Sequence, residues 1–314
     1  MAKVTKSKAT QKEQAIRLTT ARKPVVVGEP VGRYINPLTD FGFKYIFGTK
    51  EFLMDFLNAV LDVEGGIVDL YYDNTERPGR SEDDRTTIFD LFCTLGNGER
   101  IIIEMQHHRQ EFFQDRTLYY ASRLIQEQGE DKKGDKQWGF ELSPVYSVNI
   151  INFQLDADAG TVNHTVNKYA SYVQLFDRDT LEVFYKKLTF LFLELPYFTK
   201  EIHELTNYID WWMYVLKNLV KLNHLPDALR NRIFEQLFLK AEIAKLSKKD
   251  RKEYDRSLKK MRDMNIIIAD RDRKIAVLSK DITDRDVKIA VLSKDITDRD
   301  KRIAELERKL GLNS

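Results

Sequence analysis

The chain has 314 residues, 42% of them hydrophobic and 32% charged, so it can bury a core and does not have the composition of a disordered protein. Its net charge of +2 neither requires nor excludes nucleic acid as a partner, and its single cysteine excludes an intramolecular disulfide and a cysteine-based zinc site. No stretch reaches the apolar length of a membrane span and no apolar signal core opens the chain, so we expect a cytoplasmic protein.

A basic tail precedes the first predicted helices. Residues 1–30 are rich in Lys, Arg, Thr and Ala without sustained periodicity, which predicts a flexible tail and favours a solvated terminus over one that contacts phosphates. From Asp40, the segment DFGFKYIFGTKEFLMDFLNAVL has apolar residues at helical spacing and predicts one or two amphipathic helices. Asp40 is a candidate N-cap of the first of them.

Three strand-like runs follow at short spacing, and they begin at Ile67, Thr86 and Arg100. The sequence GNG at residues 96–98 separates the second run from the third, and residues of this kind tolerate the positive φ of a hairpin turn. The second and third runs should therefore pair antiparallel.

A helix and two further strands complete the α/β part of the chain. Residues 111–128 have apolar side chains at helical spacing and end before Gly129, whereas residues 144–155 return to β-type residues. The order of these elements is α, β, β, β, α, β. Residues 181–198 predict one more strand, and from Glu201 onward the pattern is helical.

The C-terminal segment is repetitive. DRDRKIAVLSKDIT at residues 270–283 recurs almost unchanged at residues 284–297. Ile recurs at every seventh position, and a companion column alternates Leu with Arg, which is typical of a coiled coil. A single solvated helix is the alternative, because Arg in every second core layer weakens association. We expect a homo-oligomer that forms through this segment.

The run IIIEMQ carries two polar side chains in an apolar, β-branched context. Side chains alternate along a strand, so Glu104 and Gln106 share one face. If residues 96–98 close a hairpin, Asp90 lies near Glu104 across the ladder. Two buried carboxylates are costly together unless one is protonated or a cation lies between them.

A hard divalent cation with oxygen ligands satisfies such a pair, so we predict a Mg²⁺ site in which Mn²⁺ or Ca²⁺ could substitute. Its candidate ligands are Asp90, Glu104 and the backbone carbonyl of Met105. Such a site supports phosphodiester hydrolysis, because the ion polarises the scissile phosphate and lowers the pKa of a bound water. Gln106 would position the attacking water, but it lacks the positive charge of a Lys.

Asp90 and the sequence EMQ that starts at Glu104 resemble the PD-(D/E)XK nuclease superfamily, with Gln in the place of the usual Lys. The wider pattern adds DFGFKYIF at residues 40–47 and RTLYYASRLI at residues 116–125. Over about residues 34–155 the chain is similar to the Rpn group, the recombination-promoting nucleases and transposases of this superfamily. In that group Glu-x-Gln is a usual form.

The resemblance implies an α/β protein with a restriction-endonuclease-like αβββαβ core and magnesium-dependent cleavage of DNA, linked to recombination or transposition. It also implies that Asp40 and Lys44 lie near the site on the first helix. Arg116, Tyr119 and Tyr120 would then lie on the helix after the Glu-x-Gln strand. Asp40 joins the candidate catalytic residues in this way, and Lys44, Arg116 and Tyr120 are candidates for substrate binding.

These flanking residues also have structural interpretations. Asp40 can cap a helix, and Lys44 can pair with Asp40 one helical turn away. Arg116 and Tyr120 share a helix face, which fits a phosphate clamp and a surface Arg beside a packed Tyr equally well. The sequence leaves both alternatives open.

The chain is therefore expected to divide into a flexible basic tail (1–30), a nuclease-like domain (31–200), a helical region (201–248) and a heptad-repeat coiled coil (249–314). The leading function is a metal-dependent DNA endonuclease. One alternative is a catalytically inactive protein of the same fold that binds DNA or acts as a scaffold. Another is a nuclease that acts on RNA, because a metal ion contacts the phosphate and not the sugar.

Overall fold

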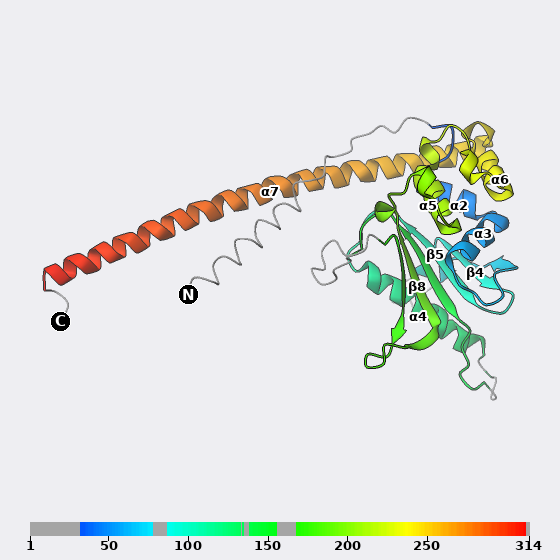
Figure 1. Cartoon of the computed structure of the whole chain (residues 1–314), viewed down its shortest axis with the longest axis horizontal. Coiled ribbons are helices and arrows are strands. Elements are labelled where there is room, and N and C mark those ends of the chain that lie inside the picture. Colours follow the sequence, from blue (N-terminus) through cyan, green and yellow to red (C-terminus); the bar gives the residue numbers. More distant parts are fainter. Residues whose placement is uncertain (1–31, 78–86, 133, 135–137, 156–167, 312–314) are drawn as a thin grey trace. The chain divides into compact units, whose positions relative to one another are not determined.

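The computed structural model describes residues 32–77, 87–132, 134, 138–155 and 168–311 (Figure 1). The basic tail that is predicted over residues 1–30 lies outside these ranges. The chain divides into two compact units, one of which runs to Leu258 while the other contains the long helix from Lys259 onward. Each unit is described by itself.

The predicted amphipathic segment forms two short helices, α2 (Asp40–Phe47) and α3 (Lys50–Val60). Thr39 caps α2, because its Oγ1 accepts a hydrogen bond from the Gly42 amide at 3.0 Å. The same hydroxyl donates to the Asn36 carbonyl at 2.8 Å, which holds the cap in place. The prediction that Asp40 is the N-cap is therefore wrong, and Asp40 is the first residue of the helix.

A six-stranded mixed sheet forms the centre of the first unit. Its strands, in sheet order, are β1 (Leu70–Tyr72), β4 (Leu91–Leu95), β5 (Arg100–Gln106), β6 (Val145–Ile151), β8 (Val183–Glu194) and β7 (Ala170–Phe176). β4 and β5 pair antiparallel across the predicted turn, whereas β5 pairs with β6, and β6 with β8, in parallel. A parallel pair needs a crossover, which α4 (Phe113–Asp131) provides between β5 and β6. For the six-stranded sheet and its helices, the predicted order α, β, β, β, α, β is confirmed as far as β6.

The second predicted strand is divided in two. β3 (Thr87–Ile88) pairs with β2 (Glu76–Arg77) in a separate two-stranded sheet, and β4 begins at Leu91. Phe89 and Asp90 lie at the break, where Phe89 is buried in the core and Asp90 is partly buried. Asp90 is therefore at the start of β4, and not within a strand as the sequence suggested.

Two other elements differ from the prediction. α4 continues through Gly129 to Asp131, and a Cβ at Gly129 would lie 3.2 Å from the ring of Trp138, so glycine lets this ring approach the helix. β8 was predicted, but its neighbour β7 was not. β7 is an edge strand in which Val173 and Leu175 remain exposed, so its burial pattern does not alternate cleanly.

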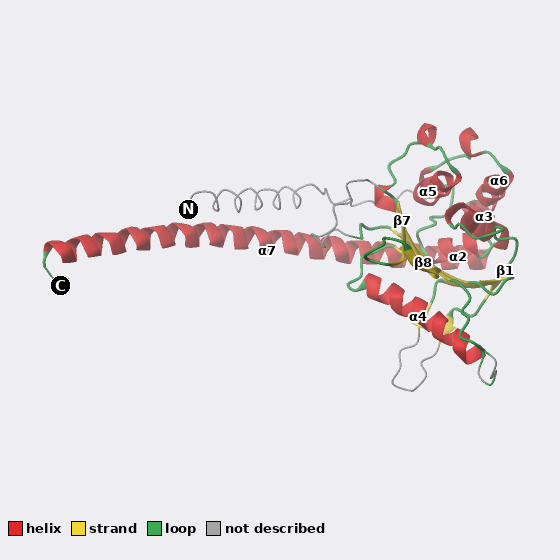
Figure 2. Ribbon diagram, turned by 60° about the horizontal axis from the view of Figure 1, so that its bottom comes forward, coloured by secondary structure: helices red, strands yellow, loops and turns green. Residues whose placement is uncertain are grey.

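Helices cover both faces of the sheet, with α4 on one side and α2, α3 and α5 (Tyr208–Asn218) on the other (Figure 2). Under α4 the core contains Phe89 from the break between β3 and β4, Phe92 and Ile102 of the strands, and Leu124 of the helix. On the opposite side, Trp212 of α5 is fully buried, and its ring lies near aromatic rings of α2, α3 and α6 (Arg232–Ala241). Both faces therefore bury aromatic and β-branched residues.

Short 3₁₀ turns connect the C-terminal helices of the first unit: η1 (Leu195–Tyr197), η2 (Ile202–Glu204), η3 (Leu219–Lys221), η4 (Asp227–Leu229) and η5 (Ile243–Lys245). The last helix, α7 (Lys248–Lys309), begins in this unit, where Tyr254 and Leu258 are buried. The Tyr254 hydroxyl accepts a hydrogen bond from the Asn36 amide at 2.9 Å.

From Lys259 onward α7 is one continuous helix, and from Ile275 onward its large apolar side chains are exposed. The helix that the heptad pattern predicts is thus present, whereas its pairing as a coiled coil stays a prediction, as does the division of the chain into four domains. Over the ranges that the structure describes, no helix is long and apolar enough to cross a membrane.

Candidate active site

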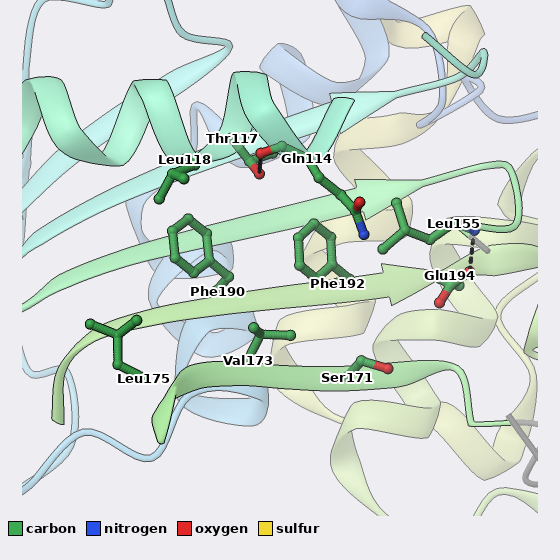
Figure 3. A pocket seen from close by; sticks show the side chains of 10 residues that line it. All are labelled: Gln114, Thr117, Leu118, Leu155, Ser171, Val173, Leu175, Phe190, Phe192 and Glu194. Atoms are coloured by element: carbon green, nitrogen blue, oxygen red, sulfur yellow. Dashed lines mark hydrogen bonds between the residues drawn. The ribbon is translucent and has the colours of Figure 1, made fainter. Parts of the chain in front are cut away.

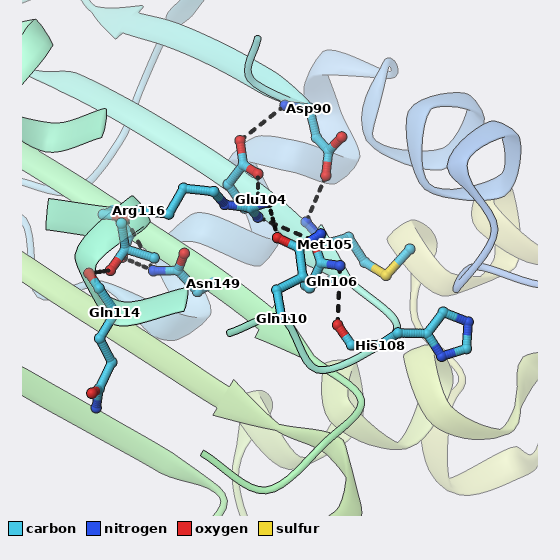
Figure 4. Close-up of polar contacts among 11 residues, drawn as sticks. Asp90, Glu104, Met105, Gln106, His108, Gln110, Gln114, Arg116 and Asn149 are labelled. Carbon is cyan, nitrogen blue, oxygen red and sulfur yellow. Dashed lines mark hydrogen bonds and ion pairs between the residues drawn. The ribbon is translucent and has the colours of Figure 1, made fainter. Parts of the chain in front are cut away.

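The site lies where the β4–β5 ladder ends. The last pair of this ladder is Leu91 with Ile103, so Asp90 and Glu104 are the next residues on the two strands. The Asp90 amide donates to Glu104 Oε1 at 3.1 Å, and the Met105 amide donates to Asp90 Oδ2 at 2.8 Å (Figure 4). The two carboxylates are therefore held side by side, each by a backbone N–H of the other strand.

Burial and mutual repulsion keep this pair from ionising fully. The Glu104 side chain is only 7% exposed. Its burial and the neighbouring Asp90 carboxylate raise the pKa of Glu104 to about 8, although the Arg116 guanidinium opposes the shift. Burial also raises the pKa of Asp90. Near neutral pH one proton, or one bound cation, therefore balances the pair.

The donor atoms at this position fit a hard divalent cation. A residue in a strand directs its N–H and C=O to the same side, so the Met105 carbonyl faces the Asp90 side of β5. Two carboxylates and one carbonyl oxygen suit an ion such as Mg²⁺, which keeps several waters. No group of three or more His, Cys, Asp or Glu residues gathers as a metal cluster in the described part of the chain, so water would complete the ion's coordination.

Gln106 has its side-chain amide held at both ends. Its Nε2 donates to the His108 carbonyl at 3.1 Å, and its Oε1 accepts from Arg116 Nη2 at 3.0 Å. The His108 ring is half-buried, and burial lowers its pKa. This ring points away from Asp90 and Glu104 (Figure 4), so the histidine contributes its backbone and not its imidazole to the site.

Arg116 of α4 reaches from the helix into the site. Its Nη2 lies 3.5 Å from Glu104 Oε2 as well as 3.0 Å from Gln106, and its Nη1 donates to Gln110. The guanidinium also lies over the ring of Tyr120, 5.4 Å from the centroid. Arg116 is therefore partly buried and contacts the site, and its role as a phosphate clamp stays a prediction. Tyr120 is packed, however, because its ring meets Phe89 edge-on at 5.3 Å.

Asp40 and Lys44 of α2 pair with each other, with Lys44 Nζ 2.7 Å from Asp40 Oδ1, and both side chains are well exposed. Their charges still act on the site, because Lys44 lowers the pKa of Asp90 while Asp40 raises it. The structure thus brings Asp90, Glu104 and their β5 neighbours into one network with Arg116. Asp40 and Lys44 lie near that network, and the structure gives no direct contact between them and Asp90.

Sequence reasoning missed Asn149 on β6, directly beside Glu104 in the sheet. Asn149 is fully buried, and its Nδ2 donates to the Ser147 carbonyl at 3.0 Å, while its Oδ1 is buried without a hydrogen-bond partner. Arg116 Nε is also buried without a hydrogen-bond partner. The sequence did contain a signal for Asn149, because it is a polar residue inside the apolar run VNII. Glu104 was identified from the same kind of pattern.

An open groove of about 420 Å³ lies on the α4 side of the sheet (Figure 3). Phe190 and Phe192 of β8 form its floor, and α4 contributes Gln114 and Thr117 to one wall. The sheet register places Phe192 next to Asn149, so the groove begins two strands away from Glu104. Among the described residues that line it, none is Lys or Arg.

A family model described as a PD-(D/E)XK nuclease family transposase matches residues 37–271, which include both helices of α2–α3, the whole sheet and α4. The six-stranded mixed sheet with helices on both faces is consistent with that fold. No curated protein and no solved structure matches the chain.

Proposed function

Since the chain belongs to the PD-(D/E)XK nuclease family of transposases, we propose that it is a metal-dependent DNA endonuclease linked to recombination or transposition. The observation that carries this proposal is the buried pair of Asp90 and Glu104, whose carboxylates lie side by side at the end of the β4–β5 ladder. A structural pair would not need two acidic groups in a place that raises the pKa of both.

Asp90, Glu104 and the Met105 carbonyl would hold Mg²⁺, and Mn²⁺ or Ca²⁺ could substitute. When bound, the ion supplies positive charge at the scissile phosphate and lowers the pKa of a coordinated water. The carboxylates must be ionised to bind it, so near neutral pH the cation would displace the proton that the pair shares.

Gln106 is proposed to orient the attacking water. Its contacts with His108 and Arg116 use one N–H and one lone pair of the amide, and an amide has two of each. Both contacts fix the amide plane, so the second N–H and the second lone pair have defined directions. A water held by such a group has a defined position relative to the carboxylates.

Arg116 is proposed to supply the positive charge that Gln106 lacks. The superfamily pattern has a Lys at the position of Gln106, and here the Arg116 guanidinium lies 3.0 Å from the Gln106 amide oxygen. An arginine on α4 can therefore place its charge almost where the lysine would have placed it. Lys44 adds a second, more exposed cation that a phosphate could reach.

The test is plasmid nicking with and without Mg²⁺. We expect cleavage that requires the ion, and a loss of at least about a thousandfold in Asp90→Ala and in Glu104→Ala, because each removes a carboxylate that holds the ion. Asp227→Ala is the matched control, since the Asp227 side chain is 90% exposed and lies on η4. Nicking at a near wild-type rate by either site variant would overturn the assignment.

The same experiment separates the alternative functions. Purified protein that binds DNA but shows no magnesium-dependent nicking would favour the inactive, DNA-binding or scaffold protein. Competition between DNA and RNA of the same sequence would identify an RNA nuclease, because the carboxylate pair contains nothing that recognises a 2′-hydroxyl.

Homo-oligomerisation through α7 is also proposed. The exposed apolar side chains of α7 recur at heptad spacing, and pairing with another helix is the usual way to bury such a column. The cytoplasmic location stays a prediction from the sequence.

A further inference from the structure

One face of α7 has two columns of side chains. The first column contains Ile275, Ile282, Ile289, Ile296 and Ile303, and each of these side chains is more than half exposed. In the second column Leu278 and Leu292 alternate with Arg285 and Arg299. The two columns correspond to the a and d positions of a heptad, so a partner helix would meet Leu and Arg layers in turn.

We propose that this face binds α7 of a second copy of the chain in antiparallel orientation, in a register that places Ile282 against the partner's Arg285. This inference rests on the proposed pairing of α7 and adds its direction and register. The charges that flank the two columns differ between the Leu layers and the Arg layers, and they favour one direction and one register.

A parallel, in-register pair sets like charges against each other. Arg285 would meet the partner's Arg285 in the core, because parallel helices pair d with d. On the flank, a g residue meets the e residue five positions later in the partner, so Asp281 would lie opposite the partner's Asp286. The next repeat would place Asp295 opposite the partner's Asp300 in the same way. Core and flank therefore both disfavour this arrangement.

An antiparallel pair removes both conflicts. Its layers combine an a residue with a d residue, so each Arg meets an Ile and can extend its guanidinium toward water along the Ile side chain. The flanking g residues then face one another: Lys274 lies opposite the partner's Asp295, and Asp281 opposite the partner's Lys288. The four charged g residues of these two repeats, Lys274, Asp281, Lys288 and Asp295, thus each face an opposite charge across the interface.

The register follows from the same charges. A shift by one heptad would set Lys274 against the partner's Lys288 and Asp281 against the partner's Asp281, so neighbouring registers are repulsive. In the proposed register the two-fold axis passes between Thr283 and Asp284. That point is also the middle of the helix from Lys259 to Lys309, so the charge-matched register is the one with the most overlap. The contact is symmetric and closes as a dimer.

Thiol cross-linking in the full-length chain tests the direction. Ile275→Cys and Leu292→Cys chains, carrying tags of different mass, are co-expressed and treated with a short bifunctional thiol reagent. The proposal predicts a cross-link between the two kinds of chain and none within either kind, because identical positions would lie about 25 Å apart along the axis. The wild-type chain is the control, since its only cysteine, Cys93, is fully buried.

Cross-links between identical chains would show a parallel pair and overturn the proposal. Absence of any cross-link would overturn it as well, and light scattering would then separate a monomer, in which the pairing itself fails, from a dimer that uses another surface. Nicking activity is measured on the same samples, so failure of the nuclease proposal is seen independently.

Charge reversal tests the register. Asp281→Lys should weaken dimerisation about tenfold, because it places a Lys opposite the partner's Lys288 at two symmetric positions. Adding Lys288→Asp in the same chain should restore the affinity. A parallel pair predicts the opposite sign for Asp281→Lys, which would then face the partner's Asp286. Sedimentation measures the dimer affinity, and a stronger dimer in the single variant would contradict the proposal.

Discussion

At the scale of single residues, the site depends on a carboxylate that the fold does not allow to ionise easily. Glu104 is buried and follows the buried isoleucines of β5, and the Asp90 carboxylate accepts a hydrogen bond from the Met105 amide. A bound cation would remove the free-energy cost of ionising both carboxyl groups. The two charges therefore make the unliganded protein less stable and make the site able to hold a metal.

This arrangement predicts how stability depends on pH in the absence of metal. The pKa of Glu104 rises from its usual 4.5 to about 8 in the folded protein, so between these values the folded state holds a proton that the unfolded chain has released. The free energy of unfolding should therefore fall as pH rises from about 4.5 to 8, by up to about 1.4 kcal/mol per pH unit. Urea unfolding at several pH values, in the presence of a chelator, measures this free energy.

Glu104→Gln should flatten that pH dependence, because the amide keeps the shape and loses the titrating group. Glu111→Gln is the matched control, since Glu111 is exposed and outside the network. If the free energy of unfolding of Glu104→Gln still fell with pH as steeply as in the wild type, another group would cause the loss of stability. In the wild type, Mg²⁺ should raise stability more at pH 8 than at pH 6, because ion and proton compete for the same oxygens.

Gln106 supports a second prediction at this scale. Gln106→Lys should fold and retain measurable nicking with an altered metal preference, because a cation at this position is the superfamily pattern. It would, however, repel Arg116, whose Nη2 now donates to the Gln106 oxygen. Gln106→Leu should lose at least about a hundredfold, since it can hold neither water nor Arg116. Equal, full activity in both variants would show that Gln106 is only part of the polar face.

At the scale of elements, α2 depends on a close approach at its first turn. A Cβ on Gly42 would lie 2.0 Å from the Asn36 carbonyl oxygen and 2.8 Å from Thr39 Oγ1, the two atoms that form the N-cap. Gly42→Ala should therefore destabilise the protein by about 1–3 kcal/mol through overpacking, even though Ala favours helices. Gly96→Ala is the control, because nothing lies within 4 Å of a Cβ there. Thermal unfolding measures the stability of both variants relative to the wild type.

The elements also explain why the pairing of Asp90 with Glu104 was partly predictable. The GNG turn and the alternation of IIIEMQ define the hairpin, and the hairpin places position 90 beside position 104. Periodicity did not reveal the break between β3 and β4, because the residues on both sides of Asp90 are strand-forming and no Gly or Pro separates them. That break is what frees the Asp90 N–H and carboxylate to bond to β5.

At the scale of the whole molecule, removal of residues from about 265 onward should leave a folded nuclease unit of lower oligomeric order. The buried residues of α7 are Tyr254 and Leu258, and both remain in this truncation. The melting temperature should change by only a few degrees, while light scattering should report a smaller species. A full-length protein that is already a monomer at micromolar concentration would contradict the coiled-coil pairing.

A longer truncation, from residue 250 onward, provides the contrast. It removes Tyr254, whose hydroxyl accepts from the Asn36 amide and whose ring lies 5.9 Å from that of Phe41. The loss of this buried ring and the unpaired amide should cost about 3–5 kcal/mol. Equal melting temperatures for the two truncations would show that the first turns of α7 do not support α2.

The sequence by itself determined the order of the elements, the neighbourhood of Asp90 and Glu104, and the heptad face of α7. These features depend on local periodicity and on turn chemistry, which short stretches of sequence encode. The tertiary structure alone decided that Arg116 approaches Gln106, that Asn149 lies beside Glu104, and that Thr39 caps α2. The first two contacts form when α4 and β6 pack against β5 and bury polar groups that must find partners there. The cap was not predictable because Thr39 and Asp40 are both favourable N-cap residues, and only the backbone of the folded chain selects between them.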